Sequence, residues 1–138
     1  MGLFSSMRIS GSALTAQRLR MDVVAGNIAN ADTTRTNGQR APYQRQQVVF
    51  QPLIAAAASP GDGLQVTAIV RDTSPARQVY DPSHPDADPQ TGLVAYPNVD
   101  TTTEMTDLLS ASRAYEANVT VLNAIKQMAQ RSIDLGRA

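Results

Sequence analysis

Residues 102–135 read TTEMTDLLSASRAYEANVTVLNAIKQMAQRSIDL, a stretch without proline in which a seven-residue pattern recurs. Its two series are Leu108, Tyr115, Leu122 and Ala129, and Ser112, Val119, Lys126 and Ile133. A period of seven is typical of an α-helix that packs lengthwise against another helix. We therefore predict one long helix here, about 51 Å in length. Thr101 with Glu104 predicts a capping box at its start.

The N-terminal flank shows a similar pattern and predicts a partner helix over residues 10–31. Its two series are Met7, Leu14, Met21 and Ile28, and Leu3, Ser10, Gln17, Val24 and Ala31. Asn27 and Asn30 interrupt the apolar end of this helix. These amides either bond across a helix pair and fix its register, or simply help to end the helix.

The segment between the two flanks is of a different kind, because all eight prolines lie between Pro42 and Pro97. Proline breaks helix interiors, so this middle is predicted to be irregular or β-rich. Residue alternation and β-branched residues favour strands over 47–50, 64–70, 78–80 and 93–96, with a loop over 55–63. The predicted fold class is α+β. Long helices in segments 1–41 and 98–138 pair as a coiled coil, and residues 42–97 form a small β-rich domain.

The composition excludes several classes of function. The chain has no cysteine and one histidine, which rules out a disulfide, a thiolate metal site and a multi-histidine metal centre. Its 12 basic and 12 acidic residues balance to zero, so a general nucleic-acid binder is not expected. No apolar stretch approaches the ~20 residues that span a bilayer, and no cleavable signal peptide is expected.

The neutral total hides an uneven distribution of charge. Residues 1–50 carry a balance of +4, residues 51–104 of −5 and residues 105–138 of +1. This distribution has two interpretations: complementary contact between neighbouring copies, or an ordinary solvated surface. In the acidic middle, Asp81, Asp86 and Asp88 surround the only histidine, His84. Hard cations prefer such oxygen ligands, but the neighbouring prolines favour a solvated turn. We expect no metal, no cofactor and no catalytic residue.

Both predicted helices carry apolar residues on more than one face, whereas two helices alone bury only one stripe each. The surplus predicts burial inside a larger assembly. Two other readings are a peripheral membrane protein with an amphipathic helix on lipid, and a small metal-dependent hydrolase built on the acidic loop. The residues expected to carry helix pairing and assembly are Leu14, Met21, Ile28, Leu108, Tyr115, Val119 and Leu122.

Two stretches resemble the signatures of bacterial flagellar rod and hook proteins. One spans residues 12–33 and the other residues 104–118. Segments 42–50, 80–88 and 96–99 are similar to one proximal rod member of that family, so the resemblance covers nearly the whole chain. The signature residues are Asn27, Ile28, Ala29 and Asn30 in the first stretch, and Tyr115, Glu116, Ala117 and Asn118 in the second.

The resemblance implies a structural protein that is not an enzyme and has no small-molecule substrate. It implies terminal helices that pack into the inner layer of a hollow helical shaft, the rod of the flagellar basal body, which crosses the periplasm and transmits motor torque. The implied partners are copies of the chain, other rod proteins and the flagellar type III export apparatus, which delivers subunits without signal cleavage or direct membrane insertion. The nearest alternative is another axial subunit or a rod-adjacent adaptor.

Overall fold

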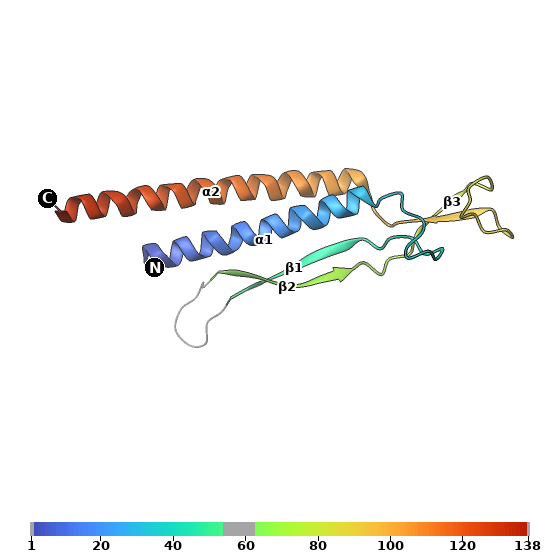
Figure 1. Ribbon diagram of the computed structural model, residues 1–138, viewed down its shortest axis with the longest axis horizontal. Coiled ribbons are helices and arrows are strands. Elements are labelled where there is room, and N and C mark those ends of the chain that lie inside the picture. The colour runs from blue at the N-terminus through green and yellow to red at the C-terminus, as the bar shows by residue number, and fades with distance from the viewer. Residues whose placement is uncertain (1, 54–62, 138) are drawn as a thin grey trace.

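The computed structural model describes residues 2–53 and 63–137 as an elongated α+β molecule, which confirms the predicted fold class (Figure 1). All four strands coincide with predicted ones to within one or two residues. Most of the loop predicted over 55–63 lies outside the described residues. In chain order the elements are α1 (Leu3–Ala29), β1 (Gln46–Pro52), β2 (Leu64–Arg71), β3 (Arg77–Tyr80), β4 (Leu93–Tyr96) and α2 (Thr101–Arg137).

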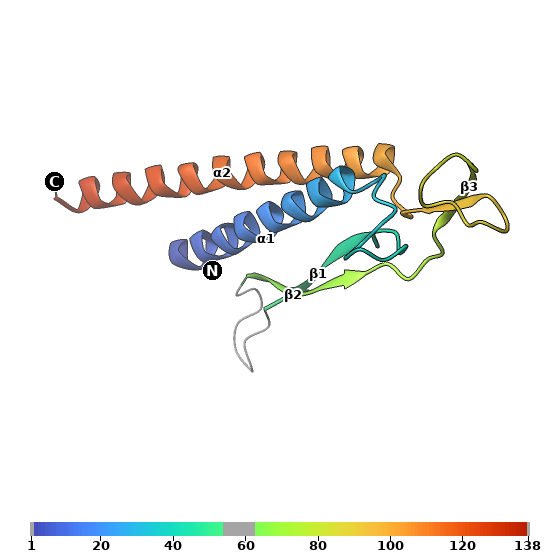
Figure 2. The ribbon, with the colours of Figure 1, turned by 45° about the vertical axis from the view of Figure 1, so that its right-hand side comes forward.

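Three layers lie side by side over the part of the molecule that the β1–β2 hairpin spans (Figures 1 and 2). The helix α2 forms one outer layer, α1 the middle layer, and the antiparallel β1–β2 hairpin the other outer layer. The two helices run in opposite directions, and α2 continues past the N-terminal end of α1. The middle position explains why α1 is apolar on more than one face, because it contacts α2 on one side and the hairpin on another.

The residues of α2 that face α1 form two series, each with a spacing of seven. The first series is the predicted one, and the second lies one residue earlier than predicted. The first series is half-buried as expected at Leu108, Tyr115 and Leu122. The buried positions beside it are Glu104, Ala111 and Ile125. Lys126 and Ile133, which were predicted to face α1, are exposed. Burial of Ile125 in place of Lys126 keeps the lysine ammonium in water, where a charge is stable.

The bounds of α1 also differ from the prediction. The helix begins at Leu3 rather than near residue 10, since Leu3 and Met7 already belong to its seven-residue pattern. It ends at Ala29 because the backbone of Asn30 leaves the helical region, at φ −105° and ψ 14°. The side-chain amide of Asn30 donates to the Gly26 carbonyl at 2.9 Å. Of the two roles considered for the asparagines, Asn30 therefore has that of ending the helix.

The predicted capping box at the start of α2 is wrong. The residue that caps this helix is Asp100, whose carboxylate accepts hydrogen bonds from the Thr102 N–H at 3.0 Å and the Thr103 hydroxyl at 2.9 Å. An aspartate in this position satisfies backbone donors that the first turn leaves free. The side chain of Glu104 is instead fully buried inside the molecule.

The β1–β2 hairpin depends on α1 for support, because two strands alone are marginally stable in water. Its register pairs Gln46 with Arg71. At the other end, the Leu64 N–H donates to Ser12 Oγ of α1 at 2.9 Å. The preceding Gly63 has φ +129°, and a Cβ there would lie 2.6 Å from Ser12 Oγ. Only glycine combines this backbone conformation with so close an approach to the helix.

The strands β3 and β4 form a second antiparallel hairpin, beyond the joined ends of the helices (Figure 1). The β-rich middle is thus two separate two-stranded sheets rather than one small sheet. The loop between β3 and β4 is tied to the segment that follows α1. Asp86 in this loop accepts a hydrogen bond from the Thr34 hydroxyl at 2.8 Å and forms an ion pair with Arg35, and both of these residues follow α1.

The cap of α2 gives a pH-dependent prediction. Asp100→Ala is expected to lower the urea midpoint of the purified chain, whereas Asp100→Asn keeps it, since asparagine caps helices equally well. Hydrogen bonds from Thr103 and Thr102 hold the pKa of the Asp100 carboxyl below its usual value. Its contribution is complete above about pH 4 and is lost as the pH falls through the lowered pKa.

Urea unfolding followed by circular dichroism at pH 7 and pH 3 checks this cap. Acid should lower the midpoint less in Asp100→Asn than in the unmodified chain, because the amide does not titrate. An alanine variant with an unchanged midpoint at pH 7 would show that Asp100 does not stabilise α2.

Candidate functional site

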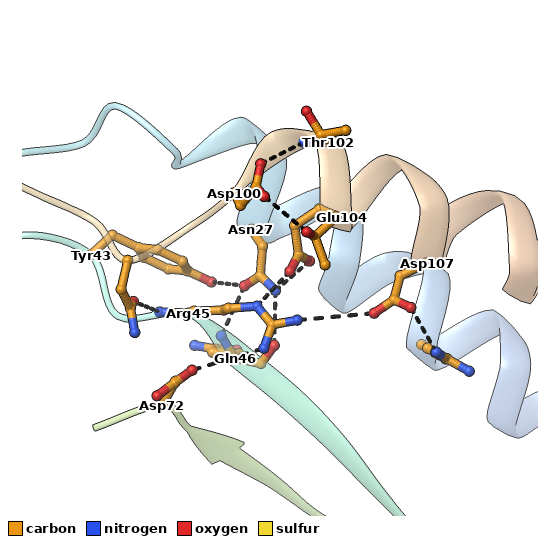
Figure 3. A network of polar contacts seen from close by, with 12 residues as sticks. Asn27, Tyr43, Arg45, Gln46, Asp72, Asp100, Thr102, Glu104 and Asp107 are labelled. Carbon is orange, nitrogen blue, oxygen red and sulfur yellow. Dashed lines mark hydrogen bonds and ion pairs between the residues drawn. The ribbon is translucent and has the colours of Figure 1, made fainter. Parts of the chain in front are cut away.

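The amide of Asn27, in the last turn of α1, joins three segments of the chain (Figure 3). It is fully buried. Its Nδ2 donates to the Gln46 carbonyl at 2.8 Å and to Glu104 Oε2 at 2.9 Å. Its Oδ1 accepts from the Gln46 N–H at 2.9 Å and from the Tyr43 hydroxyl at 3.0 Å. All four hydrogen bonds available to the amide are made, and one of them crosses the helix pair.

Glu104 is a fully buried carboxylate in the first turn of α2, and Arg45 neutralises its charge. The Arg45 Nε donates to Glu104 Oε1, while Asn27 donates to the other carboxylate oxygen. Breaking a buried ion pair by removing one partner costs about 3–5 kcal/mol, because the charge left behind has no compensation. The position of Glu104 therefore depends on both α1 and the residue that precedes β1.

The ion pairs extend outwards from Arg45 (Figure 3). Its guanidinium lies 3.9 Å from carboxylate oxygens of both Asp72 and Asp107. Asp107 also accepts a hydrogen bond from Arg20 of α1 at 3.1 Å. Two arginines and three carboxylates thus alternate across α1, α2 and the hairpin. The polar node, as we name this group, consists of Arg20, Asn27, Arg45, Glu104 and Asp107.

The Tyr43 hydroxyl, which donates a hydrogen bond to Asn27, is neutral. Burial raises the pKa of the Tyr43 hydroxyl, the Glu104 carboxylate raises it further, and Arg71 lowers it in part. The hydroxyl therefore keeps the proton that it donates to Asn27. Every group of the polar node is used in a hydrogen bond or an ion pair within the molecule, so the arrangement is suited to holding segments together.

The seven residues predicted to carry helix pairing all lie on the two packed helices, and all are half-buried. Val119 belongs to the displaced series and lies one position round the helix from the buried line of Ala111 and Ile125. The role of these residues in assembly stays a prediction. They are Leu14, Met21 and Ile28 on α1, and Leu108, Tyr115, Val119 and Leu122 on α2.

The signature residues differ in how far they are buried. Asn27 is buried in the polar node, and Asn118 uses its amide within α2, where it donates to the Ala114 carbonyl at 2.9 Å. The exposed residues of the signature, unlike the half-buried ones, have side chains open to contacts outside the chain. Half-buried signature residues are Ile28, Asn30, Tyr115 and Asn118, and exposed ones are Ala29, Glu116 and Ala117.

Sequence reasoning missed Arg45 and gave Glu104 a different role. A signal for Glu104 exists, because it lies seven residues before the buried Ala111 and so belongs to the series that faces α1. A carboxylate in such a series predicts a buried partner. Arg45 offers no comparable signal, since it lies in an irregular segment 59 residues from Glu104 in the sequence.

The acidic loop after β3 does not gather its carboxylates around a common point. Asp81 and Asp88 accept hydrogen bonds from residues two and three positions later, and Asp86 binds Thr34 and Arg35. Within residues 2–53 and 63–137, no three acidic, histidine or cysteine side chains come together as metal ligands would. Nor does either described helix carry an apolar stretch long enough for a bilayer crossing.

The polar node predicts a large difference between the two asparagines of the signature. Asn27→Ala leaves buried partners without a hydrogen bond and is expected to destabilise the chain by about 2–4 kcal/mol. Asn30→Ala is the matched control, because Asn30 is only half-buried, and a loss below about 1 kcal/mol is expected. Urea unfolding followed by circular dichroism measures both values. Equal losses would mean that the node does not fix the helix pair.

The chain is similar to known proteins over nearly its whole length. A family model for flagella basal body rod proteins matches residues 7–35, and one for the C-terminal part of flagellar basal body rod FlgEFG proteins matches residues 90–135. The flagellar basal-body rod protein FlgC of Bacillus subtilis is 44% identical over 99% of this chain and 100% of its own length. The FlgC proteins of Escherichia coli O6:H1 (46%; 99% and 100%) and Borreliella burgdorferi (45%; 93% and 93%) are similar to the same degree. The chain therefore belongs to the FlgC family of flagellar basal-body rod proteins.

Proposed function

We propose that copies of this chain, a structural subunit of the flagellar basal-body rod, pack through their α1–α2 pairs into a hollow helical shaft. The shaft transmits torque, so the subunit acts by rigid contact and performs no chemical turnover. The observation that carries this proposal is the amount of surface, much of it apolar, that a single copy leaves uncovered.

The exposed surface of one copy is larger than a compact protein of its size would have. The chain exposes 9455 Å², whereas a compact monomer of 14.7 kDa exposes about 6,900 Å². The difference, about 2,500 Å², is roughly three times the ~800 Å² that one partner contributes to a standard interface. An extended subunit with several neighbours accounts for a surplus of this size.

The helix α2 carries part of the exposed apolar surface. Large exposed apolar side chains on this helix are Met105, Leu109, Val121, Met128, Ile133 and Leu135. Counting along the antiparallel pair from the Asn27–Glu104 contact places Leu3 opposite Met128, so residues 129–137 extend beyond the start of α1. An overhanging helix end with apolar side chains is stable when neighbouring subunits cover it.

The polar node suits a subunit under torque. It fixes α1, α2 and the start of β1 in a single register through charged groups that are costly to separate. Force on the hairpins therefore reaches the helix pair without sliding between elements. We further propose that the subunit belongs to the proximal rod, which crosses the periplasm, that it contacts other rod proteins, and that the flagellar type III apparatus exports it.

Substitution of the helix interface tests the role of α2 in assembly. Leu122→Asp puts a carboxylate on the half-buried face towards α1, and a buried Leu→Ala change alone costs about 2–5 kcal/mol. In a strain without the natural copy, we expect this variant to be made and delivered for export but not to enter the rod. Swimming assays and purified basal bodies provide the measurement.

The matched control is Asn123→Asp, which adds the same charge one residue later at an exposed position. This variant should restore swimming. Normal swimming by Leu122→Asp would refute the role proposed for the helix pair.

A further inference from the structure

The connection between α1 and β1 contains a tight turn centred on Asn37 and Gly38. The Gln39 N–H donates to the Thr36 carbonyl at 3.0 Å, and the Thr36 N–H donates to the Gln39 carbonyl at 3.1 Å. Both central residues have positive φ, +52° for Asn37 and +77° for Gly38. These are the features of a type I′ turn, in which Asn-Gly is a preferred pair.

Asn37 and Gly38 bring together the two groups of a cyclisation reaction. Both residues are exposed, and neither the Asn37 amide nor the Gly38 N–H forms a hydrogen bond with another described residue. Asn37 is also the only asparagine in the chain that a glycine follows. Because glycine has no side chain to crowd its nitrogen, that nitrogen can reach the side-chain carbonyl carbon of the preceding asparagine and close a five-membered ring.

The reaction removes ammonia and then adds water. The Gly38 nitrogen bonds to the side-chain carbonyl carbon of Asn37 and gives up its proton, and the bond from that carbon to the side-chain nitrogen breaks, so ammonia leaves. Water then opens the cyclic imide at one of its two carbonyl carbons. Opening at the side-chain carbon gives aspartate in an ordinary main chain. Opening at the main-chain carbon gives isoaspartate, whose main chain runs through the side chain and is one carbon longer.

The closed turn slows the first of these steps. In a type I′ turn the Gly38 nitrogen lies almost opposite the Asn37 side chain across the Cα–C bond, so the ring closes only after the turn has opened. Opening breaks the two backbone hydrogen bonds between Thr36 and Gln39, and residues 37–40 are all exposed. Exposed segments with few contacts open at a low cost in free energy, so the turn delays the reaction without preventing it.

We propose that Asn37 is a modification site, at which the chain deamidates spontaneously to aspartate and isoaspartate. Isoaspartate cannot re-form the turn, because the additional main-chain carbon displaces Gln39 relative to Thr36. Either product also brings a new negative charge. The reaction itself does not depend on the proposed function. Its accumulation with age does, since a subunit packed into a shaft is held there by its neighbours.

The turn lies between two contacts that hold the connection against the loop between β3 and β4. Before the turn, Arg35 forms an ion pair with Asp86, and after it the Arg40 guanidinium donates to the Ala87 carbonyl at 3.4 Å. A main chain that is longer between the two arginines no longer matches this pair of contacts. Isoaspartate at position 37 is therefore expected to loosen the connection from the loop.

Peptide mapping of the purified full chain tests the site. Trypsin cleaves after arginine and so releases residues 36–40 as one peptide, in which Asn37 is the only asparagine. After incubation at pH 8.5 and 37 °C, the mass of this peptide is expected to rise by about 1 Da over its value in a fresh sample. The tryptic peptide of residues 21–35 contains Asn27 and Asn30, neither followed by glycine, and should keep its mass as the internal control.

Gly38→Ala separates the chemistry from the opening of the turn. Alanine at φ +77° strains the turn and favours opening, yet its Cβ crowds the attacking nitrogen, so the mass change is expected to be at least about tenfold slower. A second readout identifies isoaspartate, which protein isoaspartyl methyltransferase methylates while it leaves aspartate unmodified. The aged natural chain should accept methyl groups, and freshly purified Asn37→Asp should not.

Brief digestion of the native chain by trypsin measures the loosening. Cleavage after Arg35 and Arg40 is expected to be faster in the aged chain than in fresh Asn37→Asp, which has the same charge on a main chain of normal length. Equal rates, or an aged chain that accepts no methyl groups, would overturn the loss of the turn.

The modification site itself would be refuted by a peptide of residues 36–40 whose mass stays unchanged through the incubation. An equally fast change in the peptide of residues 21–35, or in Gly38→Ala, would refute it as well. None of these results bears on the rod assignment, because failure of that assignment would show in the swimming and basal-body measurements.

Discussion

A fully buried carboxylate can persist in this molecule only while Asn27 and Arg45 satisfy its two oxygens. Glu104 is held at the start of α2 by a residue from the end of α1 and another from the segment before β1. Sliding either helix by one turn would separate these groups and leave a charge unpaired in the interior, at a cost of several kcal/mol. The polar node therefore sets the register of the helix pair, and the apolar contacts along the helices follow from it.

The layered arrangement is compatible with the proposed use of one helix pair for both folding and assembly. The helix α1 lies between α2 and the hairpin, so the chain itself covers two of its faces. Of the described elements, only α1 contacts α2, and large apolar side chains elsewhere on α2 are exposed. A molecule built in this way buries Asn27 and Glu104 at the centre of its polar node and exposes apolar helix surface, a combination that suits the proposed rigid shaft of many subunits.

Local patterns were enough to predict both helices and all four strands, because seven-residue repeats and strand-like alternation are properties of short segments. They failed where the outcome depended on distant partners. Thr101 with Glu104 has the spacing of a capping box, yet Asp100 caps the helix and Glu104 turns towards α1. The buried series of α2 lies one residue earlier than predicted for a related reason. Buried Glu104 fixes which face of α2 turns towards α1. Arg45 had no local signal at all.

The polar node fixes an α1–α2 pair, and we propose that neighbouring subunits cover its outward apolar surface. Cryo-electron microscopy of isolated basal bodies, with this chain traced, is the decisive measurement. We expect antiparallel helices with Asn27 bonded to Glu104, and side chains such as Met128 and Leu135 packed against adjacent chains. Helices that separate from each other in the rod, or a shaft in which those side chains face water, would contradict this expectation.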